Sequence, residues 1–213
     1  MTEPYNQYDP PNLPSRTIHF WFRTRRITGV GFPPDRVHSH VVRLRIQPSR
    51  LDRFVIGFLS LFPTRVVHSY LERWLPEWFL PPAIVVKSEK PDWEDEFDDE
   101  VALYNRLSSL QGTVIPYYYG TTRLGGVRTH ILSDIGGVSL PLKGASGIDD
   151  PTFRKMLLRA LGAIALQGFV HDDLKLDNFH LVGDKIMVLD LEQVEFVESL
   201  DRRKFFCSLL SIA

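Results

Sequence analysis

The stretch His171-Asp172-Asp173-Leu174-Lys175-Leu176-Asp177-Asn178, with Asp190 twelve residues further on, decides how we interpret this chain. Apolar residues flank the stretch on both sides, so it is not an ordinary solvated loop. The apolar runs 179–182 and 186–191 that follow it are joined by Gly183-Asp184, which predicts a hairpin. This hairpin would fold Asp190 back beside Asn178.

The side chains of this stretch match the requirements of phosphoryl transfer. A carboxylate must orient the attacking hydroxyl and accept its proton, and a cation must offset charge on the phosphoryl oxygens. Asp173 and Lys175 can fill these two catalytic roles. Oxygen ligands must also hold Mg²⁺, and Asn178 and Asp190 are the ligands that we predict.

Outward from this stretch, the back half of the chain is regular. The clearest helix begins at Asp150-Pro151, carries apolar residues at helical spacing and ends at Gly168. A second helix is expected from about 93 to 110, with acidic first turns that suit the positive end of the helix dipole. A short apolar strand at 83–87 and a hairpin around Gly125-Gly126 complete this pattern.

The front of the chain is basic and rich in proline. The segment 16–53 holds nine arginines and two acids, whereas seven of the nine residues 92–100 are acidic. Alternating apolar residues predict strands near 18–22 and 42–46. We interpret the basic cluster Arg23, Arg25 and Arg26 as a solvated strand edge.

An aromatic segment lies between the basic front and the regular back half. Tyr70 and Trp74 are four residues apart, on one face of a helix that we expect Pro76 to end. We interpret these two rings as a packing surface rather than as part of a cofactor site.

Composition excludes several classes of protein. The 213 residues carry a net charge of −1, which argues against a dedicated nucleic-acid binder. A single cysteine, Cys207, excludes a disulfide framework and a four-cysteine zinc site. The first 16 residues contain no apolar run, so we expect no secretory signal, and no stretch approaches the ~20 apolar residues of a membrane span. We expect a cytoplasmic or nuclear protein with no nucleic-acid or membrane partner.

The pattern His-x-Asp-Leu-Lys-x-x-Asn, with an aspartate after the next apolar strand, resembles the catalytic loop and metal motif of the protein kinase superfamily. The resemblance spans about residues 83–195 and implies ATP and Mg²⁺ as cofactors. It implies that Lys87 holds the nucleotide phosphates and that Glu100 pairs with Lys87, with Glu96 as the rival. Residues 131–134 resemble the hinge that takes the adenine, which adds Ser133 and Asp134 to the cofactor-binding set.

Four features depart from the kinase pattern. No glycine lies between Gly57 and Gly112, so the glycine-rich phosphate loop is not evident before Lys87, and Gly29-Val30-Gly31 is too far upstream and lacks the third glycine. Asp190-Leu191-Glu192 replaces Asp-Phe-Gly, and an acid at that place resembles kinases of small molecules such as choline kinases. Asp172 replaces the arginine that kinases usually have directly before the catalytic aspartate. Finally, only 23 residues follow Asp190.

The resemblance implies an α+β, two-lobed protein-kinase-like fold. It would have a small antiparallel N-terminal sheet and an incomplete, mostly helical C-terminal lobe. We expect a disordered arm at 1–16, an N-terminal lobe with a basic, proline-rich extension at 17–134, and a shortened C-terminal lobe with the catalytic loop at 135–213.

The function that the resemblance implies is ATP-dependent phosphotransfer. Lys175, two residues after Asp173, favours a Ser/Thr-type kinase acting on a protein hydroxyl, whereas Glu192 favours a small-molecule substrate. A catalytically weak or inactive kinase-like binding module, a pseudokinase, is the other alternative. Besides ATP, we expect a protein substrate or a partner that docks on a last helix beginning near Asp201.

Overall fold

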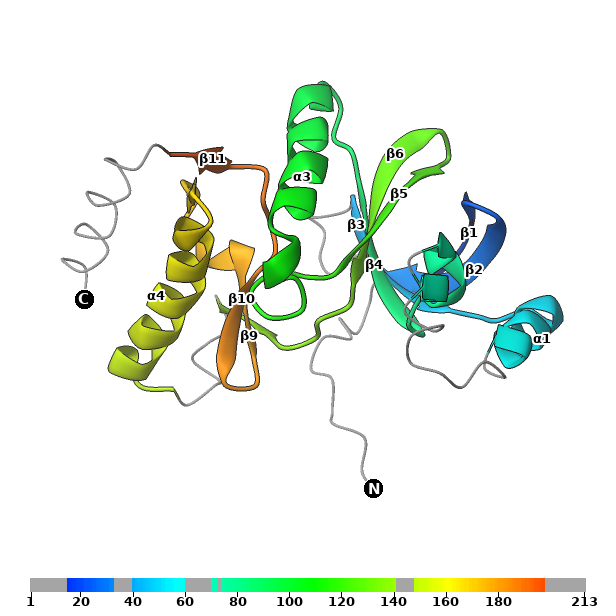
Figure 1. The fold of residues 1–213 in the computed structure, drawn as a ribbon, viewed down its shortest axis with the longest axis horizontal. Coiled ribbons are helices and arrows are strands. Elements are labelled where there is room, and N and C mark those ends of the chain that lie inside the picture. The colour runs from blue at the N-terminus through cyan, green and yellow to red at the C-terminus, as the bar shows by residue number, and fades with distance from the viewer. Residues whose placement is uncertain (1–14, 33–39, 60–69, 73, 141–147, 198–213) are drawn as a thin grey trace. The chain divides into compact units, whose positions relative to one another are not determined.

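The computed structural model describes residues 15–32, 40–59, 70–72, 74–140 and 148–197 of the chain (Figure 1). These residues form two compact units. The first, here called the sheet unit, comprises the described residues up to Trp93 together with Tyr118–Asp134. The second, here called the α3–α4 unit, comprises Glu94–Tyr117 and the described residues from Ile135 onward.

The sheet unit is built on a six-stranded antiparallel sheet with the order β1-β2-β3-β4-β6-β5. The strands are β1 (Arg16–Phe22), β2 (Arg25–Phe32), β3 (Val41–Ile46), β4 (Ala83–Ser88), β5 (Tyr118–Leu124) and β6 (Val127–Ser133). The prediction of an α+β protein with an antiparallel sheet is therefore confirmed. The predicted Gly125-Gly126 turn is confirmed as well, and both glycines have the positive φ that a tight hairpin turn requires.

The core of the sheet unit lies on one face of this sheet. Alternate residues along each strand point to the same side, so the apolar members of that set pack together. The buried residues of this core are Ile18, Phe20, Phe22, Ile27, Val42, Leu44, Ile46, Ile84, Val86 and Ile131.

The sequence pattern does not reveal β2, because glycines occupy two of its inward positions. A Cβ built on Gly31 would lie 2.2 Å from the backbone oxygen of Arg43 on β3, and one on Gly29 would meet the Leu44 side chain. The two glycines are therefore needed for the close approach of β2 and β3.

Between β3 and β4, the described residues 70–72 and 74 are helical. Two further short elements there are the helix α1 (Arg50–Leu59) and the 3₁₀ turn η1 (Pro76–Trp78). Arg25 contacts both, because its Nε donates to Asp52 Oδ1 at 3.1 Å and its Nη1 donates to the backbone oxygen of Glu77 at 2.8 Å. The interpretation of Arg25 as part of a solvated edge is wrong, since the side chain is buried in an ion pair.

The α3–α4 unit combines helices with two small sheets. Its helices are α3 (Glu94–Arg106) and α4 (Asp150–Leu166), with 3₁₀ turns η2 (Ser108–Leu110) and η4 (Leu176–Asn178). Its strands are β7 (Val138–Ser139), β8 (Phe169–His171), β9 (Phe179–Val182), β10 (Lys185–Val188) and β11 (Val194–Phe196). They form a three-stranded sheet with the order β10-β9-β7 and a two-stranded ladder of β8 and β11.

Helix α4 supports the strands that carry the site. It packs against β8 and β10 through buried residues that include Leu161, Ile164 and Ala165. Its predicted end at Gly168 is confirmed, since this residue has a φ of 95° and donates to the oxygen of Ala165. The sequence predicts Asp150 as its N-cap, but the N-cap is Asp149 and Asp150 is the first helical residue. The last helix, predicted from Asp201, lies outside the described residues, as do residues 1–14 of the predicted arm.

Within the described part of the chain, no helix is both long and apolar enough to cross a membrane.

Candidate functional site

The loop that carries Asp173 is fixed at its start by the segment that follows Asp190. Strand β8 pairs with β11, so that His171 lies opposite Val194. Beyond this ladder, the Asp172 amide donates to the backbone oxygen of Gln193 at 2.9 Å. The two parts of the predicted motif, which are distant in sequence, are therefore joined by backbone hydrogen bonds within one unit.

Asp173 is held by hydrogen bonds from within its own loop. Its Oδ2 accepts from Lys175 Nζ at 3.1 Å, and its Oδ1 accepts from the Lys175 amide at 3.3 Å. Its backbone oxygen accepts from Asn178 Nδ2 at 3.1 Å. Burial raises the pKa of the Asp173 carboxyl, but the hydrogen bonds from Lys175 and Asn178 outweigh it and hold the pKa below its usual range. The carboxylate is therefore ionised at neutral pH.

His171 links the loop to Asp190. Its Nε2 lies 2.7 Å from the backbone oxygen of Asp190, and a carbonyl can only accept, so Nε2 must carry the proton. The ring is buried and tilted against Phe179, with centroids 5.7 Å apart. Burial lowers the pKa of His171 and favours the neutral ring, although the hydrogen bond to the Asp190 backbone acts in the opposite direction.

Asp190 follows β10 in a short turn that is pinned on both sides. The Leu189 amide donates to the backbone oxygen of Asn178 at 2.8 Å, which brings Asp190 back to the Asp173 loop as predicted. The Glu192 amide donates to Asp190 Oδ1 at 3.1 Å. Leu191, between the two acids, is fully buried and anchors the turn.

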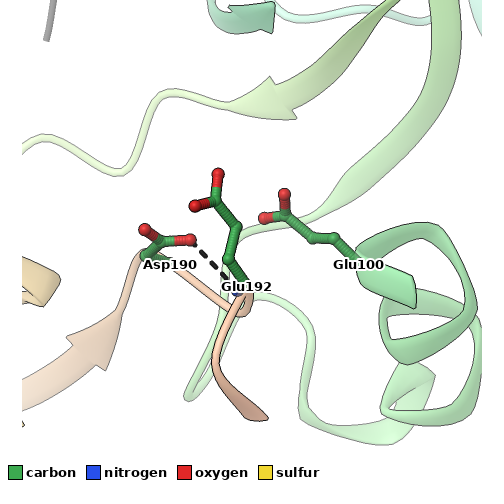
Figure 2. A group of neighbouring side chains, drawn as sticks. All are labelled: Glu100, Asp190 and Glu192. Atoms are coloured by element: carbon green, nitrogen blue, oxygen red, sulfur yellow. Dashed lines mark hydrogen bonds between the residues drawn. The ribbon is translucent and has the colours of Figure 1, made fainter. Parts of the chain in front are cut away.

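Three carboxylates meet beside this turn (Figure 2). Each of Glu100, Asp190 and Glu192 offers an oxygen, and these oxygens all lie within 4.8 Å of one another. Glu100 comes from the buried face of α3, one turn from Phe97 and Tyr104. Like charges this close repel, and a divalent cation with oxygen ligands would offset that repulsion.

The donor set of this acidic triad fits Mg²⁺. Hard oxygen ligands are what this ion prefers, and it usually takes one or two carboxylates together with water and phosphate oxygens. The predicted ligand Asn178 uses its amide nitrogen on the Asp173 backbone, so Oδ1 is the atom that it could offer to a cation.

The remaining predicted residues belong to the sheet unit. Lys87 lies on β4, buried, opposite Val41 on one side and His130 on the other. Ser133 ends β6, opposite Ile84. Asp134 follows it and forms an ion pair with Arg43 of β3. The carboxylate that the resemblance assigns to the hinge is thus paired with Arg43.

Sequence reasoning missed Glu192 as a member of the site. The signal was visible, because an acid occupied the place where the kinase pattern has glycine. The sequence indicates Glu192 only as a departure from that pattern and as a residue that favours a small-molecule substrate, not as a neighbour of Glu100 and Asp190. The role of His171 was also missed, since nothing in the sequence shows that its ring reaches the backbone of Asp190.

The comparisons with known proteins place the chain in no family: no family model matches the sequence, and no curated protein matches it.

Proposed function

We propose that this chain is a protein-kinase-like phosphotransferase that uses ATP and Mg²⁺. The observation that carries the proposal is the coupling of the Asp173 loop to Asp190. His171 bonds the Asp190 backbone, Leu189 bonds Asn178, and Asp172 bonds the segment behind Asp190. Phosphoryl transfer needs both a base for the substrate hydroxyl and a ligand for the cation that binds the phosphates. These contacts hold the candidate base, Asp173, and the candidate ligand, Asp190, in one arrangement.

Asp173 is the proposed base. Its lowered pKa keeps it ionised, so its role is to orient a substrate hydroxyl and accept the proton as the new bond forms. Lys175 is bonded to that carboxylate and its side chain is largely exposed. It is therefore available to offset charge on the transferred phosphoryl group.

The acidic triad and Asn178 are the proposed cation ligands. A bound Mg²⁺ would neutralise charge on the phosphate oxygens of the nucleotide. The contribution of the chain is to hold Asp190 through the Glu192 amide and the His171 ring, before any nucleotide arrives.

The sheet unit offers support for the nucleotide-binding part of the proposal. Strand β4, which carries Lys87, ends the antiparallel meander β1–β2–β3–β4 and is its third strand when counted from β2. In protein kinases the phosphate-binding lysine lies on the third strand, after the hairpin with the glycine-rich loop. Residues 47–82 are inserted between β3 and β4, and this insertion accounts for most of the distance in sequence between Gly29-Val30-Gly31 and Lys87. That distance is therefore not an argument against a phosphate loop before β3. We propose Lys87, Ser133 and Asp134 as nucleotide contacts on this basis.

One observation favours the pseudokinase alternative. The connection between β2 and β3, residues 33–40, contains two prolines and no glycine. Glycine lets backbone amides approach phosphates closely, and prolines have no amide proton to offer. A second observation, the acid Glu192 in the triad, favours a small-molecule substrate over a protein hydroxyl.

Thermal unfolding of the full chain tests nucleotide binding. We expect Mg-ATP at a hundred times its Kd to stabilise the protein by about 2.7 kcal/mol, and ATP with a chelator to stabilise it much less. No stabilisation by Mg-ATP would refute the proposal.

Transfer of the γ-phosphate separates the alternatives. The labelled phosphate is followed onto a Ser/Thr peptide library and, in parallel, onto small alcohols such as choline. Label on peptides supports a protein kinase, and label on small alcohols supports the second substrate class. Binding of Mg-ATP without any transfer would identify a pseudokinase.

A further inference from the structure

Helix α1 carries an apolar stripe that faces outward. Leu51, Phe54 and Phe58 lie on one side of the helix and are 66%, 73% and 54% exposed. Asp52 and Leu59, on the other side, are buried. A ten-residue helix with three large exposed apolar side chains in a row is unusual for a surface that meets only water.

Helix α1 is fastened to the sheet unit by its buried side. Ser49 and Asp52 exchange hydrogen bonds as a capping box, with the Ser49 amide on Asp52 Oδ2 and the Asp52 amide on Ser49 Oγ. Asp52 also pairs with the buried Arg25. A partner that enclosed the helix would have to break this pair, whereas a flat surface could meet the stripe as it stands.

Two further aromatic side chains of the sheet unit are exposed. Tyr70 and Trp74 are 63% and 75% exposed, so the described residues do not pack over these rings as the interpretation of a packing surface would require. Tyr and Trp combine a large apolar ring with one polar group, which suits the boundary between water and lipid.

The charge around α1 is positive. Arg50 and Arg53 lie on the helix beside the apolar stripe and are exposed. Elsewhere in the sheet unit, Arg23 in the β1–β2 turn and Arg26 on β2 are exposed as well. Among residues 15–32 and 40–59, Asp52 is the one acid, and Arg25 neutralises it. An apolar stripe edged by arginines is the pattern of helices that lie in the interface of anionic membranes.

We propose that α1, together with Tyr70 and Trp74, docks the chain on a membrane surface that contains anionic lipids. The apolar stripe would enter the boundary between headgroups and acyl chains, and the arginines would meet the phosphates. This replaces the expectation of no membrane partner, which rested on the absence of a spanning stretch. The inference does not depend on the proposed function, because it uses none of the site residues.

Flotation of the full chain with lipid vesicles tests the inference. We expect the protein to float with vesicles of phosphatidylcholine containing about 30 mol% phosphatidylserine, and far less with phosphatidylcholine alone. Raising the salt from about 0.1 M to about 0.5 M should weaken binding, since the arginine contribution is screened. The emission of Trp74, measured as the difference between the parent and Trp74→Phe, should shift to the blue.

Two double variants test the residues. Phe54→Gln/Phe58→Gln should lower vesicle affinity more than tenfold, because each ring loses its burial in the lipid boundary. Arg50→Gln/Arg53→Gln should lower it by about fivefold for each arginine. The matched controls lie on α4, where Leu166 is an exposed apolar residue and Lys155 and Arg159 are exposed cations. Leu166→Gln and Lys155→Gln/Arg159→Gln should bind vesicles like the parent.

The replaced side chains are exposed, so the variants should keep the far-ultraviolet circular dichroism of the parent. Equal binding of Phe54→Gln/Phe58→Gln and the parent would overturn the inference. So would an absence of vesicle binding, combined with a concentration-dependent dimer that Phe54→Gln/Phe58→Gln abolishes, since the stripe would then cover a second copy.

Discussion

Asp173 is the residue on which the proposed reaction depends most directly. Its carboxylate is bonded to Lys175 at both oxygens, and it is ionised at neutral pH because its pKa is lowered. These contacts fix the orientation of the Asp173 carboxylate within its loop.

Asp173→Asn should slow phosphotransfer by ~10²–10⁴-fold, the usual share of general acid–base catalysis. It should leave the affinity for Mg-ATP nearly unchanged, because Asp173 addresses the hydroxyl. The comparison is with Asp177→Asn, an exposed acid of the same loop that should behave like the parent. An Asp173→Asn variant as active as the parent would mean that the phosphotransfer comes from another site.

Glu192 gives the second prediction at this scale. Glu192→Gln keeps the size of the side chain but removes one of the three charges of the triad, so it should weaken the stabilisation by Mg²⁺ and by Mg-ATP. Glu195→Gln, an exposed neighbour on β11, is the control and should have no effect. Titration of each variant with Mg²⁺, followed by thermal unfolding, gives the measurement. A result in which Glu192→Gln and the parent respond alike would remove Glu192 from the site.

At the scale of elements, β2 and β3 show how backbone contact constrains a sequence. Gly31 lies so close to the Arg43 backbone oxygen that no side chain fits between the strands. The glycines of β2 are therefore explained by strand packing. They are not evidence for a phosphate-binding loop. If such a loop exists, the connection that follows β2 would have to provide it.

Gly31→Ala should lower the free energy of unfolding by about 1–3 kcal/mol, because the new methyl group must push the strands apart. Gly57→Ala on α1 is the matched change, since a Cβ there meets nothing within 4 Å and alanine is the better helix former. It should raise stability by about 0.5–1 kcal/mol. Urea unfolding of both variants measures this, and a neutral Gly31→Ala would contradict the close approach of β2 and β3.

Across the sheet unit as a whole, one buried ion pair joins elements that are far apart in sequence. Arg25 at the start of β2 pairs with Asp52 on α1 and bonds the backbone of Glu77 in η1, and its guanidinium lies 5.5 Å from the Trp78 ring. This contact holds the insertion between β3 and β4 on the sheet. Removing one partner would leave the other charge buried without compensation.

Asp52→Asn should lower the free energy of unfolding at neutral pH by about 3–5 kcal/mol. Burial raises the Asp52 pKa, but hydrogen bonds from Ser49 and Arg25 lower it to a net value below 3.8. The unfolded chain therefore takes up the proton first. The stabilisation by Asp52 is present above pH 3.8 and is lost as the pH falls below it.

The stability gap between the parent and Asp52→Asn should consequently narrow in acid. Denaturant unfolding at pH 7 and at about pH 3 measures the gap at both ends. Asp99→Asn, an exposed acid on α3, should change stability little at either pH. If the difference in stability between the parent and Asp52→Asn stayed constant with pH, the pairing with Arg25 would not lower the pKa of the Asp52 carboxyl.

The sequence by itself determined the elements whose signals are local. Alternation of apolar residues located β1 and β3, a short apolar run located β4, paired glycines located the turn of the β5–β6 hairpin, and helical spacing located α4. The two apolar runs around Gly183-Asp184 predicted a hairpin that would bring Asp190 beside Asn178, and the Leu189–Asn178 hydrogen bond bears this out. Such features depend on neighbours in the chain, so the sequence alone carries them.

Only the tertiary structure decided which side chains meet across long distances in the chain. The burial of Arg25 depends on Asp52, and the acidic triad depends on how α3 lies beside the turn at Asp190. Nothing local in the sequence distinguishes Arg25 from its exposed neighbour Arg26, or Glu192 from the exposed Glu195. Their roles follow from free energies of burial and charge pairing, which exist only after the elements have packed.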